Sequence, residues 1–527
     1  YVAQRAGIGI NAGRIRGINA KIRGGEVQHT GVVPFLKKFE STVRCCTQNG
    51  IRGGSATVHF PIWHQEIQDI LVLKNNKGTE DNRVRKLDYS IQISKLFYER
   101  FIANEDVSLF SPHDVPGLYD AFGTNNFDEL YEQYEADESI PRTTIGGQEL
   151  ILDLLKERAE TGRIYIMNID HCNSHSSFQD KVEMSNLCQE ITLPTKPIQH
   201  IDDNSGEIAL CILSAINVGK IRDVSDFEVL CDLSVRSLDE LIDFQGYPVR
   251  AAEIATKARR SLGVGFIGLA HYLAKQGVKY DDSEAWKMVH GLTESFQYYL
   301  IKSTVNLAKE KGAYSTFNGS PLSEGKLQFD LWDVKPSNMW DWDSLREKIK
   351  KYGVRNSLLV APMPTASTSQ ILGNNECFEP FTSNMYVRRV LSGEFIVANK
   401  YLMHDLIGLG LWDDNMMNKI KAENGSIQNI AEIPADIKKL YKTVWEISQK
   451  TIIDMSADRG AYICQSQSLN IHLMNANFGK MTSMHFYAWK KGLKTGMYYL
   501  RTKAATDAIK FTAVSYTHLT LPTKRIV

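Results

Sequence analysis

The segments GQELILDLLKERAET (residues 147–161) and RIYIMN (residues 163–168) lie next to each other in the sequence and decide the fold class. In the first, apolar residues recur every three or four positions, which predicts an amphipathic helix. The second is a short and nearly continuous apolar run, which is typical of a buried strand. A helix that leads directly into a buried strand indicates an α/β protein.

The same two patterns alternate along the rest of the chain. Further helices are expected at 64–74, 88–105, 226–244, 250–260, in a segment ending at Gly312, at 437–459 and at 483–491. Further strands are expected at 207–213, 357–362 and 497–501, with short strands and tight loops in the glycine-rich residues 1–60. Strands separated by helices favour mostly parallel pairing, in a large barrel or a doubly wound sheet.

Composition excludes several classes of protein. The 61 basic and 61 acidic side chains balance, so a nucleic-acid partner is not expected. We find no apolar run long enough to span a bilayer and no secretory signal at the start of the sequence, which predicts a cytoplasmic location without membrane contact. The eight cysteines are too sparse for a disulfide framework, so any that matter are expected to be redox-active or catalytic.

The two ends of the chain are unusual. The sequence starts at Tyr1 without methionine and enters a glycine-punctuated stretch at once, whereas residues 514–527 show no helical or strand period. We interpret residues 1–513 as one domain that is truncated at its N-terminus. Residues 514–527 are expected to be a non-native or disordered tail.

The segment SNLCQE (residues 185–190) contains the first candidate for chemistry. Cys188 lies two residues from Asn186 and two from Glu190, so in an extended loop all three side chains would project to one face. A thiol, an amide and a carboxylate would then converge. The alternative is a buried cysteine beside a capping asparagine and a surface glutamate, and for the triplet taken alone this structural interpretation is favoured.

Three other segments have patterns that do not identify a site by themselves. Cys211 lies in an apolar strand, where a free cysteine usually behaves as a small hydrophobe. The two histidines of residues 170–175 lack the second ligand pair of a closed zinc site, so no metal is expected there. Residues 263–268 match the dinucleotide-binding pattern GxGxxG but follow a basic, helix-like segment instead of a strand, which makes a Rossmann site unexpected.

Two more segments leave alternatives open. Residues 364–370 follow an expected strand with small and hydroxyl side chains, so the turn could cradle a phosphate or simply cap a helix. Tyr498 and Tyr499 could be core packing, or they could act in a reaction that moves electrons and protons.

Taken together, these residues give the chain a resemblance to the large, catalytic subunit of class I ribonucleotide reductases. Six motifs agree in order: RAGIGIN (5–11), LFSP (109–112), SNLCQE (185–190), Leu210-Cys211, residues 364–380 with ILGNN (371–375), and KTGMYY (494–499). The resemblance extends from Tyr1 to about Phe511. It implies a ten-stranded α/β barrel with surrounding helices and a central finger loop that presents the radical cysteine.

The resemblance also implies an activity, the reduction of ribonucleoside diphosphates to 2′-deoxyribonucleoside diphosphates for DNA synthesis. Cys188 would form the thiyl radical, Glu190 would take the 3′-hydroxyl proton, and Asn186 would hold the ribose. Cys211 would supply reducing equivalents, with a second cysteine that the resemblance places upstream of Tyr1. Tyr498 and Tyr499 would relay the radical, which favours class I.

Ligands and partners follow from the same resemblance. The substrate diphosphate would bind Thr365, Ala366, Ser367, Thr368 and Ser369, and the small Gly7 would let the nucleotide approach closely. Arg16 and Arg23 would bind an ATP or dNTP effector. The subunit itself would hold no metal; its partners would be a second large subunit, a small (beta) subunit whose metal cofactor generates the radical, and thioredoxin or glutaredoxin.

Two alternatives to this interpretation stay open at the level of sequence. One is a cobalamin-dependent radical reductase of the same superfamily, which would need no small subunit. The other is a catalytically incomplete nucleotide-binding fragment.

Overall fold

The first third of the chain builds a sheet of parallel, buried strands. The structure is a computed structural model that describes residues 1–4, 6–48, 52–390 and 393–503. Its largest sheet has the order β1-β6-β7-β10-β16, with bounds Ile8–Asn11, Ala56–Pro61, Asp88–Ile93, Ile164–Asn168 and Thr495–Met497. The first four strands are parallel and β16 is antiparallel to β10. All residues of β6, β7 and β10 are buried, as expected for parallel strands covered on both faces.

A second group of strands comes from the middle of the chain. β11 (Leu213–Asn217) and β12 (Gly263–Ile267) are parallel, and Val264 also forms a bridge with Val360. Residues 465–469 connect the two groups through backbone hydrogen bonds: Gln465 N donates to Val360 O (3.1 Å), and Tyr498 N donates to Leu469 O (2.7 Å). The two groups of strands therefore enclose a common interior, and the α/β class is confirmed.

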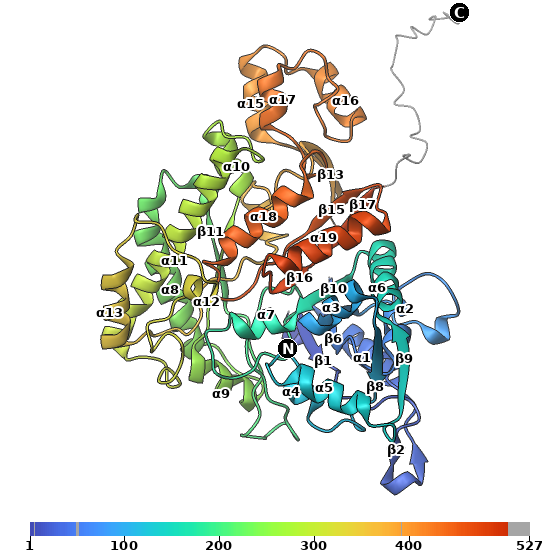
Figure 1. The fold of residues 1–527 in the computed structure, drawn as a ribbon. Helices are drawn as coiled ribbons and strands as arrows, with labels where there is room; N and C mark the ends of the chain where they lie inside the picture. The colour runs from blue at the N-terminus through green and yellow to red at the C-terminus, as the bar shows by residue number, and fades with distance from the viewer. Residues whose placement is uncertain (5, 49–51, 391–392, 504–527) are drawn as a thin grey trace, which may run out of the picture.

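Helices cover the outside of both groups (Figure 1). α6 (Gly147–Thr161) packs on β10 and touches α2 (Ile67–Val72), α3 (Lys95–Ala103) and α19 (Phe478–Lys490). α11 (Ser283–Lys311) packs against α8 (Phe227–Phe244) and α13 (Trp342–Tyr352). Further helices are α1 (Val33–Cys45), α5 (Phe127–Ala136), α9 (Arg250–Arg259) and α18 (Gln449–Gly460). Short helices are α4 (Leu118–Ala121), α7 (Ile169–Ser174), α10 (Leu269–Lys275), α12 (Gln328–Leu331) and α14 (Thr368–Ile371).

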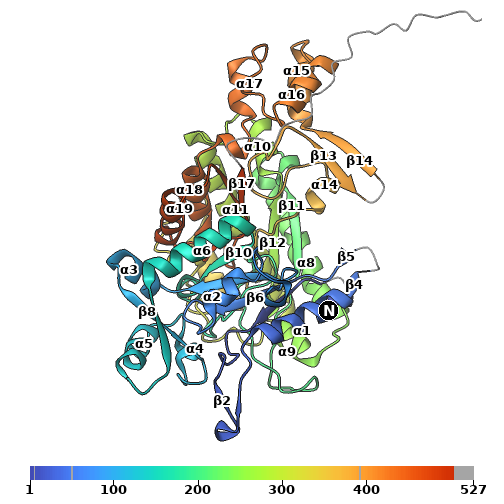
Figure 2. The same cartoon turned by 90° about the vertical axis from the view of Figure 1, so that its right-hand side faces the viewer.

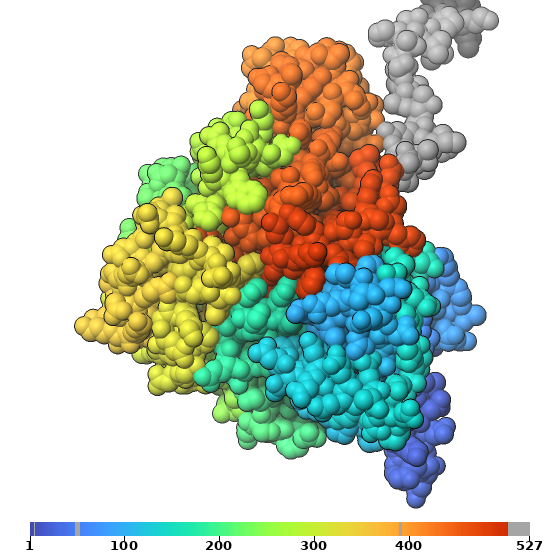
Figure 3. Space-filling view, in the orientation of Figure 1, coloured from blue at the N-terminus to red at the C-terminus, as the bar shows by residue number. Residues whose placement is uncertain are grey.

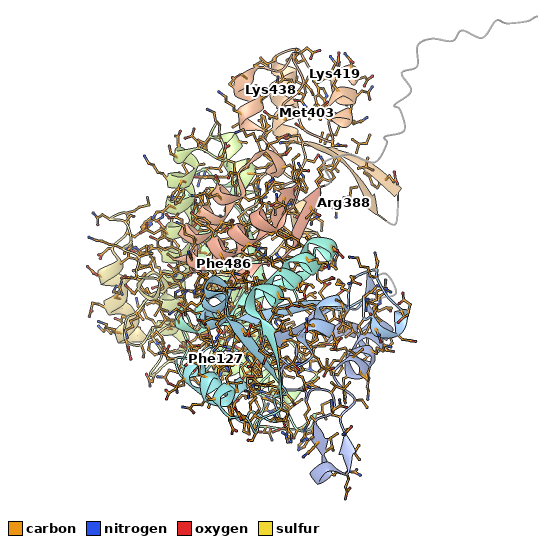
Figure 4. The ribbon with its side chains drawn as sticks, turned by 45° about the vertical axis from the view of Figure 1, so that its right-hand side comes forward. Phe127, Arg388, Met403, Lys419, Lys438 and Phe486 are labelled. Atoms are coloured by element: carbon orange, nitrogen blue, oxygen red, sulfur yellow. The ribbon has the colours of Figure 1, made fainter. Side chains whose placement is uncertain are left out.

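The C-terminal segment forms the junction between the two halves. In the space-filling view it lies between the blue and cyan N-terminal part and the green and yellow middle part (Figure 3). Phe486 of α19, labelled in Figure 4, packs edge-on against Tyr98 of α3 with ring centroids 5.1 Å apart. β17 (Leu500–Lys503) pairs in parallel with β15 (Ile471–Met474). Residues 498 and 499 are thereby fixed where the two halves meet.

Two projections extend from opposite ends of the molecule (Figure 2). At one end, helices α15 (Lys400–Gly408), α16 (Asp414–Ala422) and α17 (Ala435–Leu440) form a lobe beside the hairpin of β13 (Met385–Val390) and β14 (Gly393–Ala398). At the other end, β2 (Lys21–Ile22) and β3 (Val27–Gln28) form a narrow hairpin. Two further antiparallel pairs are β4 (Thr47–Gln48) with β5 (Arg52–Gly53), and β8 (Asp106–Phe110) with β9 (Arg142–Gly146).

Several expected elements match the structure, including the helices at 147–161, 226–244 and 250–260 and the strand at 163–168. The helix ending at Gly312 is α11, whose C-cap is Gly312. The helices at 64–74 and 483–491 are present with shifted bounds as α2 and α19. The glycine-rich first 60 residues contain the expected short strands together with α1. The expected tail at 514–527 lies outside the described residues.

Five expected elements were wrong in part. The strand expected at 497–501 is interrupted at residues 498 and 499, between β16 and β17. Residues 88–93 are strand β7 and not the start of a helix. Their sequence DYSIQI alternates polar and apolar residues, which is the period of a strand, and helix α3 begins only at Lys95. In the strand expected at 207–213, Glu207 forms a single bridge with Lys196 and residues 208–212 are irregular, since the partner strand β12 begins opposite Leu213. Only a single bridge forms in 357–362, at Val360. The helix expected at 437–459 is broken between α17 and α18, where Val444 N donates to Phe381 O.

Candidate active site

Residues 183–191, here called the finger loop, lie in the interior between the two groups of strands. From the first group, the Thr57 hydroxyl donates to Leu187 O (2.9 Å) and the Ser90 hydroxyl donates to Gln189 Oε1 (2.9 Å). From residues 465–469, Ser466 N donates to Glu190 O (2.9 Å) and the Ser468 hydroxyl donates to Cys188 O (2.7 Å). The backbone on both sides of Cys188 is thus held from two directions.

Glycines allow β1 to approach the finger loop closely. A Cβ at Gly9 would lie 2.3 Å from the Ser185 carbonyl oxygen, and one at Gly7 would lie 2.3 Å from Leu187 Cδ2. Gly7 was expected to give room to a nucleotide; the neighbour that the structure places against it is Leu187 of the loop. The small residue is needed for loop packing whether or not a nucleotide binds nearby.

The loop is turned at Cys188 and is not extended as predicted. Residues 187–189 form a turn, and Gln189 has a positive φ of 69°. Asn186 and Glu190 nevertheless converge, because the Asn186 side chain lies close enough to the Glu190 carboxylate and to the Cys211 thiol to act against the rise in the pKa of both groups. The predicted convergence of amide, carboxylate and thiol is therefore present, but a turn produces it.

The Cys188 thiol faces the first of the paired tyrosines. The Tyr498 hydroxyl lies 3.5 Å from Cys188 Sγ and 3.0 Å from the Tyr499 hydroxyl, within hydrogen-bonding distance of each. The two rings are 4.0 Å apart between centroids, and Tyr165 of β10 packs on both. Burial is the main cause that raises the pKa of Tyr498, so its hydroxyl keeps its proton.

Tyr499 is the outer member of this pair. It is half-buried, whereas Tyr498 is 5% exposed. The Arg163 guanidinium lies 5.1 Å from the centroid of the Tyr499 ring. A continuous row of Tyr499, Tyr498 and Cys188 therefore leads from the neighbourhood of the surface to the finger loop.

Glu190 has the electrostatic properties of a base. It is 2% exposed, and burial raises the pKa of its carboxyl group to about 7. Hydrogen bonds from its own backbone N–H, from Asn186 and from Ser468 oppose that shift. A carboxyl group with a pKa near neutrality can exchange a proton with a substrate at physiological pH.

Cys211 belongs to the same site. The residue is exposed, and β11 begins only at Leu213, so Cys211 does not lie in the strand where it was expected. Loss of hydration is the main cause that raises the pKa of its thiol, and negative charge at Glu190 and Cys188 adds to that increase. Cys211 therefore lies close to both residues of the finger loop.

The segment Thr365–Ser369 forms a turn next to the site. Thr365 has a positive φ of 52°, and its hydroxyl accepts a hydrogen bond from Cys377 N (2.9 Å). Ala366, Ser367 and Thr368 are exposed, whereas Ser369 is fully buried and its hydroxyl has no partner among the described residues. This combination of exposed small residues and an unpartnered hydroxyl is compatible with the predicted phosphate loop.

The two expected effector arginines lie on the β2–β3 hairpin. Arg16, at its base, donates to Lys21 O (2.7 Å) and lines a cavity of about 280 Å³ with Arg14, His113 and Tyr119. Arg23 follows β2 directly, is exposed and does not line this cavity. The structure places both cations on one exposed element but in different surroundings.

The paired histidines of residues 170–175 have structural roles. His171 and His175 stack with centroids 5.7 Å apart, and His175 also stacks on Trp332. In the part of the chain that the structure describes, no group of three or more His, Cys, Asp or Glu side chains could hold a metal ion. GxGxxG residues 263–267 form the buried strand β12, which is not the phosphate-binding turn of a dinucleotide site.

Sequence reasoning missed the residues that support the site. Tyr165 packs against the tyrosine pair, and Ser466 and Ser468 hold the finger loop. The run QSQS (465–468), whose four side chains are buried, was the available signal, because four consecutive polar residues between apolar ones are rare unless their hydrogen bonds are satisfied.

None of the described helices is long and apolar enough to cross a membrane.

Comparisons with known proteins place the chain in a family. A family described as "Ribonucleotide reductase, barrel domain" matches residues 1–499. The large subunit of ribonucleoside-diphosphate reductase from Arabidopsis thaliana is 45% identical over 96% of this chain and 64% of its own length. The corresponding large chain from Neurospora crassa is 46% identical over 96% of this chain and 54% of its own length. The chain thus spans less than two thirds of these relatives.

One solved structure extends the comparison to the fold. The alpha subunit of a class Id ribonucleotide reductase from Actinobacillus ureae superposes with a TM-score of 0.67 at 22% identity, covering 95% of this chain and 80% of the other. At that identity the match supports the fold alone. The extent of the family match and the identities above nevertheless show that the chain belongs to the ribonucleotide reductase barrel-domain family.

Proposed function

We propose that this chain is the catalytic part of a class I ribonucleoside-diphosphate reductase large subunit, with Cys188 as the radical cysteine. The contact between Tyr498 and Cys188 carries this proposal, because the hydroxyl and Sγ are 3.5 Å apart and the Tyr499 hydroxyl continues the row. Two adjacent phenols that are hydrogen-bonded to each other, the inner one to a thiol, suit coupled proton and electron transfer. A structural thiol needs no such arrangement.

The residues of the site have complementary roles in this proposal. The Cys188 thiyl removes the 3′ hydrogen of the ribonucleotide, forming an S–H bond and leaving a carbon radical. Glu190, ionised above a pKa of about 7, takes the 3′-hydroxyl proton. Asn186 can donate and accept hydrogen bonds at once, so it orients the ribose hydroxyls. The 2′ hydroxyl leaves as water, and Cys188 finally returns its hydrogen to C3′.

Reduction at C2′ needs two electrons and two protons. In the proposal, Cys211 and a second thiol supply them and form a disulfide, which thioredoxin or glutaredoxin reduces again. The raised pKa of Cys211 keeps its proton available for the departing hydroxyl. The substrate diphosphate binds the turn of residues 365–369, where the exposed small residues give access to backbone amides.

Partners and effectors complete the proposal. A small subunit with a metal cofactor supplies the radical to Tyr499, and two large subunits form a dimer in the cytoplasm. ATP or a dNTP binds near Arg16 and Arg23, whose cationic side chains suit a triphosphate. The tyrosine row favours a protein partner over a cobalamin-dependent radical source.

The direct test replaces the radical cysteine in the full-length large subunit. With the small subunit present, Cys188→Ser is expected to abolish deoxyribonucleotide formation while binding of the ribonucleoside diphosphate is retained. The matched control is Cys45→Ser, an exposed cysteine at the end of α1, which should leave turnover unchanged. Retained turnover in Cys188→Ser, or activity of the wild-type protein that needs cobalamin and no small subunit, would overturn the proposal.

A further inference from the structure

The main-chain N–H of Tyr499 is held by a side chain and not by a neighbouring strand. β16 ends at Met497 and β17 begins at Leu500, so the tyrosine pair lies in the gap between two strands. There, Tyr499 N donates to Asn470 Oδ1 (3.2 Å), and Tyr499 O accepts from Ile471 N (2.9 Å). A main-chain N–H in such a gap needs a hydrogen-bond acceptor, and Asn470 supplies it.

Asn470 is buried and is itself held at the other end of its amide. The residue is 5% exposed, and its Nδ2 donates to Glu379 Oε1. Because the amide group accepts and donates at once, it connects the main chain of Tyr499 to the carboxyl group of Glu379. Turning the amide over would place its NH2 group against the Tyr499 N–H, so the two hydrogen bonds fix one orientation.

Glu379 is held through its own main chain. Its N–H donates to Glu376 O (3.1 Å), and its carbonyl oxygen accepts from Asn375 Nδ2 (2.6 Å). Two positions earlier, Cys377 N donates to the Thr365 hydroxyl (2.9 Å). The carboxyl group of Glu379 therefore projects from a segment whose main chain is fixed at two positions.

The carboxyl group of Glu379 is a mostly uncharged acceptor at neutral pH. The residue is 7% exposed, and burial is the main cause that raises the pKa of its carboxyl group to about 8. Negative charge at Glu376 adds to this increase. The hydrogen bond from Asn470 and the positive charges of Arg501 and Arg459 oppose it. An uncharged carboxyl group still offers its carbonyl oxygen to the amide, so the contact does not require a charge.

The segment that contains Asn470 also holds the finger loop. Two residues before Asn470, the Ser468 hydroxyl donates to Cys188 O (2.7 Å). Residues 468–470 thus contact the radical cysteine at one end and Tyr499 at the other. The placement of Tyr499 relative to this segment depends on the orientation of the Asn470 amide.

We propose that Asn470 is a positioning residue for Tyr499 and that Glu379 fixes Asn470 for this role. The catalytic consequence rests on the proposed function, in which Tyr499 passes the radical inward. In the gap between β16 and β17 the amide and the carboxyl group replace the constraint that a paired strand would give. A tyrosine displaced by about one ångström is expected to transfer the radical about a hundredfold more slowly.

The competing interpretation is that the two side chains only satisfy each other's hydrogen bonds, as buried polar groups normally do. Asn384, which lies next to the start of β13, is a matched case. It is 1% exposed, its Nδ2 donates to Tyr441 O (2.8 Å), and its Oδ1 accepts from Asn399 Nδ2 (3.0 Å). Asn384→Leu therefore removes the same two kinds of hydrogen bond without touching the tyrosine pair, and it is the control.

The first test measures turnover of the full-length large subunit with the small subunit present. Asn470→Leu should lower kcat by about a hundredfold and leave the Kd for the ribonucleoside diphosphate unchanged. Glu379→Leu should act in the same way, whereas Glu379→Gln keeps an uncharged acceptor oxygen and should stay within about threefold of the wild type. Asn384→Leu should lose stability and keep its kcat. Equal losses of kcat in Asn470→Leu and Asn384→Leu would overturn the inference.

The second test reports the position of Tyr499 without turnover. A monofluorinated tyrosine is placed at position 499, and its fluorine NMR signal is recorded in each variant. Asn470→Leu and Glu379→Leu should shift or broaden the signal, whereas Glu379→Gln and Asn384→Leu should leave it unchanged. A signal that does not respond to Asn470→Leu would overturn the inference. A signal that responds while turnover does not would support the positioning role and contradict the radical row of the proposed function.

Discussion

The finger loop carries the proposed catalytic residues and the β2–β3 hairpin carries the proposed effector arginines. The two elements are packed in opposite ways. The finger loop is interior and is held by hydrogen bonds from β6, β7 and residues 465–469. The hairpin is exposed and has only two paired positions in each strand. At its base, the Glu66 carboxylate accepts from Ile18 N (2.9 Å) and Val32 N (3.0 Å).

This difference in packing indicates which of the two proposed functions, radical chemistry or effector binding, tolerates movement of its residues. In the proposed function, radical transfer depends steeply on distance, and many contacts determine the position of Cys188. The proposed effector would act by changing the position of what it binds, which is easier for an element with few tertiary contacts. The hydrogen bonds that Glu66 accepts at the base of the hairpin limit such movement to the residues beyond that base.

Removing one hydroxyl should have the largest effect. Tyr498→Phe keeps the packing on Tyr165 and Tyr499 but removes the group that lies 3.5 Å from Cys188 Sγ. Deoxyribonucleotide formation should fall by about a thousandfold or more, since the phenolic oxygen that takes the proton and the electron from the Cys188 thiol is lost. Substrate affinity and Tm should stay close to those of the wild type. Turnover within about tenfold of the wild type would show that the row is packing alone.

The contrast in packing predicts unequal effects of two glycine substitutions. Gly9→Ala places a Cβ 2.3 Å from the Ser185 carbonyl oxygen, so the finger loop must move; stability should fall by about 2 kcal/mol and turnover by about a hundredfold. Gly24→Ala in the hairpin meets no atom within 4 Å and suffers only its positive φ of 69°, which costs about 1 kcal/mol. Chemical denaturation and turnover assays measure both.

If Gly24→Ala lowered turnover as much as Gly9→Ala, the loop and the hairpin would be equally constrained. The comparison between them would then fail. Equal stability losses with unequal turnover would instead confirm that the position of the finger loop matters for chemistry beyond its contribution to folding.

The burial of Glu190 predicts a pH dependence that the hairpin lacks. With a pKa of about 7, the carboxyl group is protonated below that pH, so turnover should rise about tenfold between about pH 6 and about pH 8. Glu190→Gln should lower turnover strongly and remove this part of the profile. A wild-type profile that is flat through this range, measured with saturating substrate, would contradict Glu190 as the base.

The raised pKa of Glu190 also makes folding stability depend on pH. Stability should fall as pH rises, whereas turnover should rise. Because the folded-state pKa is above the ordinary value of 4.5, the folded state binds the proton more tightly than the unfolded state does. The stabilisation is complete below about pH 4.5 and is lost as pH rises to about 7, by about 3 kcal/mol in all. Glu190→Gln should flatten this part of the stability curve, as unfolding titrations at several pH values would show.

The smallest effect is expected at the hairpin. Arg23→Ala removes one exposed cation, so effector affinity should fall by about fivefold and the free energy of unfolding should change by less than about 0.5 kcal/mol. Isothermal titration with a dNTP measures the first quantity. A loss of stability comparable to that of Gly9→Ala would show that the hairpin is more firmly packed than its contacts suggest.

The sequence by itself determined the local features of this protein. Periodicity located α6, α8 and β10, because a helix with one apolar face and a short buried strand leave distinct patterns. The chemistry of the residue types pointed to Cys188, Glu190 and the turn at Thr365 as candidates. The resemblance to a known family then supplied roles that the residue patterns alone left open.

Only the tertiary structure decided how these residues meet. Tyr498 contacts Cys188 across 310 positions of sequence, and the raised pKa of Glu190 comes from burial by segments far away in the chain. Strand β7 is a different case, because its sequence DYSIQI alternates polar and apolar residues and so carries a local strand signal that the helix expected at 88–105 overlooked. Distance, burial and hydration depend on which segments pack together, and that information is absent from any local window of the sequence.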